Sequence, residues 1–271
     1  MNIKEMLAKL DYFYEMGRLK EAENLLDSSL IEALERRNHS AALTIYNELE
    51  GLYRTTGRAA KAAEISDKAL ELITLMGLCN TVHHATTLQN GATANRVAGN
   101  HTKALDMYSQ AAEIYKNLGK SRSYQMASLY NNISHVYQGQ NHYEKAFEYL
   151  SLALETIREL PENEAETATT QTCMALCLME LGDMEKAGFF LGEALAYYES
   201  AVGENDGHYS SALSAMGEFE WRCKNYDRAV FYYEKALRVT LARFGENYSC
   251  KIIRSNLEKI RRETSTDIQL Y

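Results

Sequence analysis

Two adjacent asparagines, Asn131 and Asn132, stand in a stretch whose other residues favour a helix, "YNNISHVYQGQNHYEKAFEYL". Asparagine is a mediocre helix former, because its side-chain amide competes for backbone hydrogen bonds. The same amide offers two donor hydrogens and an acceptor oxygen. A peptide backbone repeats one donor and one acceptor at each residue, so exposed amides on a helix could hold a bound peptide.

The cysteines are the second group of residues with evident chemistry, and they are Cys79, Cys173, Cys177, Cys223 and Cys250. Cys173 and Cys177 are one helical turn apart, but a zinc site usually needs four ligands and no matching second pair is present. The odd number and irregular spacing do not fit a disulfide framework. We therefore expect five free thiols in a reducing, cytoplasmic compartment, with no bound metal or cofactor.

Composition limits the class of protein. The 271 residues are 46% hydrophobic and 24% charged, which is typical of a globular chain. Pro161 is the single proline, and this near absence permits an almost entirely helical fold. A net charge of −8 disfavours a broad nucleic-acid surface. No apolar run approaches the roughly 20 residues that span a bilayer, and the start lacks a signal-peptide pattern.

A repeat of about 42 residues runs through the chain. Stretches such as "YEKAFEYLSLAL" and "NYDRAVFYYEKAL" recur, and their first small residues are Ala22, Ala62, Ala104, Ala146, Ala187 and Ala229. A second small residue follows seven positions later in every copy: Ser29, Ala69, Ala111, Ala153, Ala194 and Ala236. Seven residues make about two helical turns, so both lie on one face, where another helix can approach closely.

A turn is expected five residues before each first alanine. That position holds Gly17, Gly57, Gly99, Asn141 and Gly182 in the first five copies, and glycine and asparagine tolerate the left-handed conformation that ends a helix. The sixth copy departs from the pattern, because Lys224 stands there. Each copy is therefore predicted to be a helix, a short turn and a second helix.

This pattern resembles the tetratricopeptide repeat family, whose common period is about 34 residues. The resemblance covers about residues 3–245 in six copies, and the longer period is similar to that of kinesin light chains and of bacterial regulators. It implies an all-α fold, an α-α superhelix of six helix pairs in a single domain. The segment 248–263 is predicted to be a helix that caps the stack, and 264–271 a flexible tail.

The resemblance also implies which side chains face the concave groove, since the first helix of each pair lines it in this family. The groove residues predicted in this way are Asn47, Arg54, Gln89, Asn90, Arg96, Asn131, Asn132, His135, Met179 and Trp221. Ser214, Glu218 and Asn256 fall at inward positions as well. The amides suit a peptide backbone, the arginines suit a carboxylate, and the last repeats supply an apolar wall.

Three functions remain open at this point. The first is a non-enzymatic scaffold that binds a protein or an extended peptide with acidic and hydrophobic side chains. The second is a peptide-sensing regulator that acts through protein contacts. The third and least favoured is an enzyme on a helical solenoid, because Glu48 and Glu218 are too far apart in the repeat order to act as a paired acid and base. The partner's identity and the oligomeric state are not predicted.

Overall fold

The computed structural model describes residues 2–202 and 206–268, and within them it contains thirteen α-helices and no strand. The predicted all-α fold class is confirmed. The chain divides into two compact units, of which the first ends at Val136 and the second begins at Tyr137, inside the seventh helix. No helix in the described ranges is long and apolar enough to cross a bilayer. The single-domain arrangement stays a prediction.

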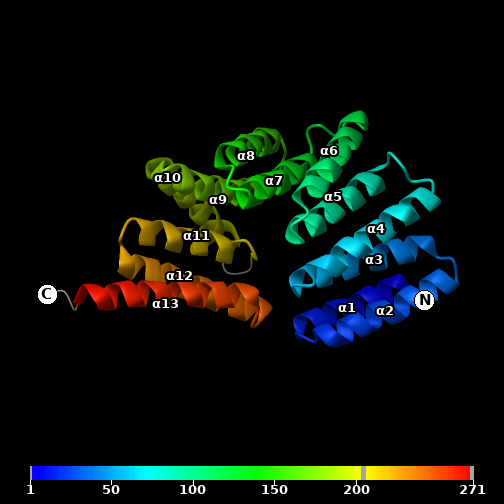
Figure 1. Cartoon of the computed structure of the whole chain (residues 1–271), viewed down its shortest axis with the longest axis horizontal. Coiled ribbons are helices and arrows are strands. Elements are labelled where there is room, and N and C mark those ends of the chain that lie inside the picture. The colour runs from blue at the N-terminus through cyan, green and yellow to red at the C-terminus, as the bar shows by residue number, and fades with distance from the viewer. Residues whose placement is uncertain (1, 203–205, 269–271) are drawn as a thin grey trace. The chain divides into compact units, whose positions relative to one another are not determined.

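The first unit is built from seven consecutive helices, the first six of which pack side by side in chain order (Figure 1). They are α1 (Ile3–Glu15), α2 (Leu19–Glu35), α3 (His39–Thr55), α4 (Ala59–Leu75), α5 (Val82–Val97), α6 (His101–Asn117) and α7 (Tyr124–Gly139). Besides these sequential neighbours, α3 also contacts α5. The first helices of the second and third pairs therefore share one surface, as the repeat pattern requires.

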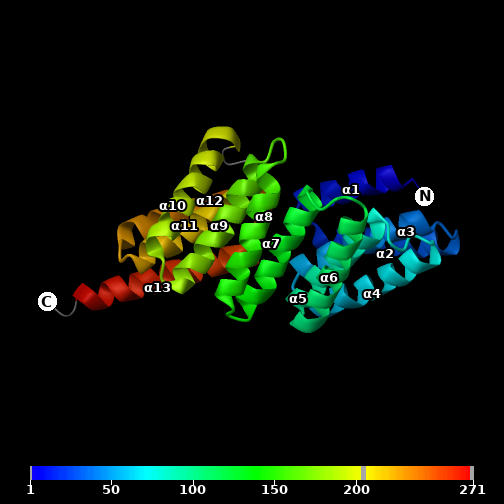
Figure 2. The same ribbon diagram turned by 90° about the horizontal axis from the view of Figure 1, so that it is seen from above.

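The second unit continues the pattern, and Figure 2 shows its helices from above. They are α8 (Tyr143–Arg158), α9 (Glu164–Leu181), α10 (Met184–Tyr197), the π-helical turn η1 (Tyr198–Val202), α11 (Tyr209–Arg222), α12 (Tyr226–Phe244) and α13 (Tyr248–Ile268). Here α9 contacts α11 in the same way, and α13 packs on α12. The last helix runs beyond the predicted end at residue 263, and residues 269–271 lie outside the described residues.

The small residues of the repeat form the helix contacts. All six alanines at the first small position have a relative exposure of 0%, Ala146 included. At the second small position the exposure ranges from 0% for four of the alanines to 7% for Ser29. The seven-residue spacing therefore predicted the packing face of each second helix correctly.

The turns within the pairs share one geometry. The residue at the expected turn position has a positive φ in all six copies, from 58° at Asn141 to 84° at Gly182. The next N–H donates to a carbonyl five residues back, for example from Arg58 to Tyr53 at 2.8 Å. This is the hydrogen bond of a Schellman motif. Lys224 adopts the same conformation with φ 62°, so the sixth turn is conserved in geometry although it lacks glycine.

Two repeats place a buried tyrosine four residues after the first small alanine. These are Tyr108 on α6 and Tyr233 on α12, with exposures of 0% and 2%. The ring of Tyr233 leaves so little room that a Cβ on Gly217 would lie 2.9 Å from it. The corresponding pair in the second repeat is Glu50 and Ser66, a larger and a smaller residue. At this helix contact the larger side chain therefore comes from the second helix in the sixth repeat and from the first helix in the second repeat.

Candidate functional site

In the first unit, α3 and α5 present predicted groove residues on neighbouring helices. They are Asn47 and Arg54 on α3 and Gln89, Asn90 and Arg96 on α5, and all five are partly buried. Because α3 and α5 are in contact, these side chains belong to one surface, which we name the α3–α5 surface. It carries two guanidinium groups.

Both arginines of the α3–α5 surface have hydrogen-bonding capacity to spare. The Nε atoms of Arg54 and Arg96 are buried and have no hydrogen-bond partner among the described residues. Arg54 Nε lies 4.0 Å from Oε1 of Glu50, which is too long for a hydrogen bond. Both side chains are partly exposed, so a ligand that supplied a carboxylate could accept charge-assisted hydrogen bonds from the accessible part of each guanidinium.

Glu50 is an unusual neighbour for Arg54. Its exposure is 1%, and its Oε1 is also without a hydrogen-bond partner in the described part of the chain. Burial raises the pKa of Glu50 to about 7, although the charge of Arg54 lowers it. The desolvation of the carboxylate therefore outweighs its attraction to Arg54, and Glu50 is close to half-protonated at neutral pH.

Arg96 interacts electrostatically with Tyr108, the buried tyrosine of α6. The hydroxyl groups of Tyr108 and Thr93 are 2.9 Å apart. Burial raises the pKa of Tyr108, while Thr93, Arg96 and Arg54 lower it. Tyr108 therefore lies in the field of both arginines, which places positive charge at the base of the α3–α5 surface.

The amide side chains divide into engaged and unengaged groups. Gln89 Nε2 donates to Ser128 Oγ at 3.1 Å and so links α5 to α7. Asn131 and His135 on α7 already have interaction partners, whereas the buried Oδ1 of Asn47 has none among the described residues. Part of the amide strip thus ties helices together. The binding of a peptide by Asn90, Asn131 and Asn132 stays a prediction.

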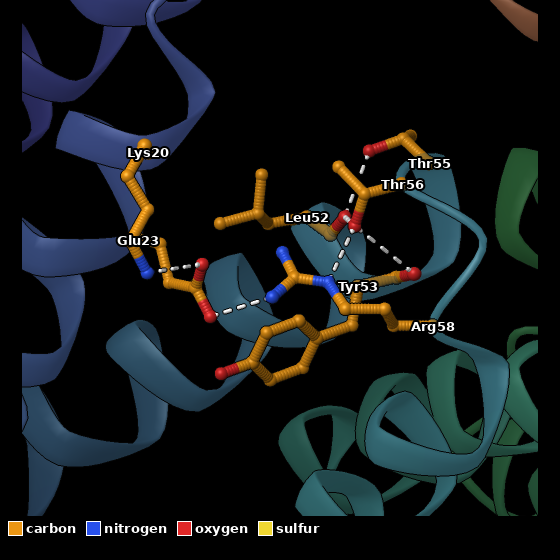
Figure 3. A network of polar contacts seen from close by, with 7 residues as sticks. All are labelled: Lys20, Glu23, Leu52, Tyr53, Thr55, Thr56 and Arg58. Atoms are coloured by element: carbon orange, nitrogen blue, oxygen red, sulfur yellow. Dashed lines mark hydrogen bonds and ion pairs between the residues drawn. The ribbon is translucent and has the colours of Figure 1, made fainter.

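Another polar cluster of the first unit serves the fold (Figure 3). Arg58 Nη1 donates to Oε1 of the buried Glu23 at 2.6 Å, and its guanidinium lies 4.5 Å from the centroid of the Tyr53 ring. The hydrogen bond from Arg58 is the main cause that lowers the pKa of Glu23. Because Glu23 lies on α2 and Arg58 directly precedes α4, this ion pair connects the first repeat with the second.

The second unit contains a cavity of 340 Å³ between its helices. Its lining comes from α9, α11, α12 and α13, and the residues are Leu176, Ser210, Ser211, Ser214, Ala215, Glu218, Tyr233, Thr240, Ser249, Ile252, Ile253 and Asn256. Glu218 Oε2 accepts from the hydroxyl of Tyr233 at 3.1 Å, and Glu218 Oε1 accepts from Arg222 Nε at 2.7 Å. We name this space the Glu218 cavity.

Met179 and Trp221, the predicted apolar wall, do not line the Glu218 cavity. Met179 is 4% exposed and belongs to the hydrophobic core of the second unit. Trp221 is partly buried; its Nε1 donates to Glu263 at 2.7 Å, and Lys259 Nζ lies 3.5 Å from the ring centroid. Leu176, which was predicted to belong to the same apolar wall, does line the cavity, together with Ile252 and Ile253.

The cysteine pair of α9 is part of the core. Cys173 and Cys177 have exposures of 8% and 0%, and burial raises the pKa of each thiol to about 12. Burial therefore opposes the thiolate form that zinc binding requires. All five cysteines are free thiols in the structure, as predicted.

The sequence matches the tetratricopeptide repeat family over residues 83–159 and 166–257, which together are more than half of the chain. The chain belongs to this family. A comparison with curated protein sequences finds no match. The family assignment therefore rests on the repeats themselves and agrees with the helix pairs and turns described above.

Several solved structures share the fold. BtubC (BKLC) from P. vanneervenii is 26% identical with a TM-score of 0.64, over 74% of this chain and 81% of that one. NprR in complex with its cognate peptide NprX is 16% identical with a TM-score of 0.74, over 96% and 74%. A putative kinesin light chain of Podosopora anserina is 14% identical with a TM-score of 0.56, over 74% and 95%.

The position of a residue within its repeat could identify most of the site residues described above, because it placed Ser214, Glu218 and Asn256 at inward positions. It could not reveal the Glu218 cavity, since Tyr233 and Thr240 enter the lining from the second helix of a pair. It also missed Glu50, which stands at a helix-packing position where Ala92 and Gly217 stand in other repeats. The sequence did contain a sign of this residue: when the repeats are aligned, Glu50 is a charged residue at a position where Ala92 and Gly217 are small.

Proposed function

We propose that this protein is a non-enzymatic scaffold whose α3–α5 surface, continued by α7, binds an extended peptide or protein segment. The observation that carries the proposal is the pair of partly exposed guanidinium groups of Arg54 and Arg96 on two contacting helices, whose Nε atoms have no hydrogen-bond partner among the described residues. Two guanidinium groups on adjacent helices suit a carboxylate, which can accept two hydrogen bonds from each. The ligand is therefore expected to carry an acidic group.

The amides would hold the ligand's backbone. Asn90 lies on α5 and Asn132 on α7, which are the first helices of the third and fourth repeats. Other polar side chains lie on the helices beside them. Hydrogen bonds from side-chain amides to a peptide backbone depend little on the ligand's sequence, so specificity would come from the arginines and from hydrophobic contacts. Trp221 stays a proposed apolar contact in the second unit.

A peptide-sensing regulator is the second candidate. It is supported by the likeness to the NprR–NprX complex, which extends over 96% of this chain. The same surface would then bind a free signal peptide, and the bound state would recruit or release another protein. The two candidates differ in whether the ligand is part of a larger protein or a free peptide.

Titration of a library of extended ten-residue peptides, varied in charge and hydrophobicity, tests the proposal. Acidic members should bind most tightly, and Asn90→Ala combined with Asn132→Ala should weaken them by one to a few orders of magnitude, because each buried bond left unmade costs about 1–3 kcal/mol. Arg96→Glu should abolish the preference for acidic peptides, and raised salt should reduce it.

Lys116→Glu is the matched control, since it makes the same change of charge at an exposed position of α6. It should leave the affinity unchanged. Equal affinity of the wild type and the folded Arg96→Glu variant would contradict the proposal and move the binding site away from the α3–α5 surface.

A further inference from the structure

The two units differ sharply in charge. The first 136 residues contain 15 basic and 15 acidic side chains, whereas residues 137–271 contain 14 basic and 22 acidic ones. The whole net charge of −8 therefore belongs to the second unit. A ligand of the second unit approaches an acidic surface, so its long-range attraction favours a cation.

The Glu218 cavity repeats this preference at short range. Among the described residues that line it, Glu218 is the one that carries a charge. Its neighbour Arg222 is not a lining residue and is shared, because it also pairs with Glu180 and donates to the carbonyl of Met179. Arg222 is thus divided between two carboxylates and does not fully neutralise Glu218.

The remaining lining residues suit an aliphatic chain with a polar end. Leu176, Ala215, Ile252 and Ile253 provide apolar contacts. Ser214, one helical turn before Glu218 on α11, and Asn256 on α13 provide oxygen acceptors in the same lining. A lysine side chain combines a four-carbon stem with an ammonium group that has three donors, which matches both parts of this lining.

Desolvation decides between a cationic and an uncharged ligand. The Glu218 side chain is 26% exposed, so a ligand that fills the cavity removes part of its remaining water. A purely apolar side chain would leave that loss uncompensated, whereas an ammonium group would replace the water with a charge-assisted hydrogen bond.

We propose that the Glu218 cavity binds a lysine side chain, or an equivalent primary ammonium on an aliphatic stem, presented by a protein or peptide. The site is independent of ligand binding at the α3–α5 surface and has the opposite charge preference. Lys259 on α13 does not supply this ammonium from within the chain, because it lies over the Trp221 ring and outside the lining.

The experiment is an NMR titration of the full-length, ¹⁵N-labelled protein with three blocked tripeptides. They are acetyl-Ala-Lys-Ala-amide, the norleucine analogue, which has the stem without the charge, and the glutamate analogue. We expect the lysine peptide to shift the amide signals of Ser214, Ile252 and Asn256 and to bind about tenfold more tightly than the norleucine peptide, with the glutamate peptide weakest.

Glu218→Gln should abolish the preference for lysine over norleucine. Glu258→Gln removes the same charge from an exposed position of α13 outside the cavity and should keep that preference. Ile252→Arg places a cation at a lining position that is 47% exposed, so the protein should fold and the lysine peptide should lose at least tenfold in affinity.

Equal binding of the lysine and norleucine peptides would overturn the proposal. So would a lysine preference that survives in Glu218→Gln, a preference for the glutamate peptide, or the absence of any shift at the three reporter amides. Circular dichroism of each variant establishes that it is folded before its titration is interpreted.

Discussion

The third repeat and the sixth repeat use the same buried tyrosine in opposite electrostatic surroundings. In the third, the hydroxyl of Tyr108 meets Thr93 and lies near Arg96. In the sixth, the hydroxyl of Tyr233 donates to Glu218. Burial raises the pKa of both tyrosines, but Glu218 raises that of Tyr233 further, whereas Thr93 and Arg96 partly offset the rise at Tyr108.

This difference teaches how a repeat scaffold can diversify its surfaces. The alanine contacts and the turns are the same in both repeats, and the tyrosine lies in the same register. Exchanging the residues around its hydroxyl reverses the charge presented on the first-helix surface without changing the packing below. The first unit therefore presents arginines, and the second presents a carboxylate in a cavity.

The largest expected effect concerns the second repeat, which has neither the tyrosine nor the small residue opposite it. The folded pKa of Glu50 is about 7 against an ordinary value of 4.5, so the folded state binds the proton more tightly than the unfolded state. Stability should therefore fall as the pH rises from about 4.5 to 7 and then level off, by about 3 kcal/mol at most.

Glu50→Gln should remove this pH dependence. It should match the wild type at pH 4 and be more stable at pH 8 by up to about 3 kcal/mol, measured by urea denaturation across the pH range. Glu258→Gln, at an exposed position, is the control and should keep the wild-type profile. A Glu50→Gln variant with that same profile would contradict the assignment.

The second prediction concerns the packing of Gly217 against Tyr233 in the sixth repeat. Gly217→Leu should overpack the contact with Tyr233 and cost about 1–3 kcal/mol of unfolding free energy, because a single Cβ would already lie 2.9 Å from the ring. Gly192→Leu on α10, where a Cβ meets nothing within 4 Å, is the matched control. Thermal denaturation of both variants gives the comparison, and equal costs would refute it.

The two tyrosine hydroxyls should differ in what they contribute. Tyr233→Phe removes a bond to a carboxylate and should cost about 1–2 kcal/mol, whereas Tyr108→Phe removes a bond between neutral groups and should cost about 1 kcal/mol. Urea denaturation of the two variants measures both. A larger cost for Tyr108→Phe would show that Arg96 depends on that hydroxyl more than the geometry indicates.

The smallest expected effect lies at the turn of the sixth repeat. Lys224 has φ 62°, a conformation that glycine adopts without steric cost. Lys224→Gly should therefore stabilise the protein by about 0.5–1 kcal/mol, and Gly182→Lys should destabilise the corresponding turn of the fifth repeat by a similar amount. Melting temperatures of the two variants test the pair, and shifts of the same sign would be inconsistent with this account.

The sequence by itself determined the helix pairs, their turns and their packing face. These features depend on local rules: small residues seven apart mark a buried face, and glycine or asparagine at a fixed offset marks the end of a helix. The same register identified the arginines of the α3–α5 surface and the position of Glu218.

Only the tertiary structure decided which of these groups have partners. Gln89 donates a hydrogen bond to Ser128, whereas the Nε atoms of Arg54 and Arg96 have no hydrogen-bond partner in the part of the chain that the structure describes. Met179 lies in the core, and the Glu218 cavity takes part of its lining from α12 and α13. Such pairings join residues far apart in the chain, and hydrogen bonding and burial depend on distances in space that sequence spacing does not contain.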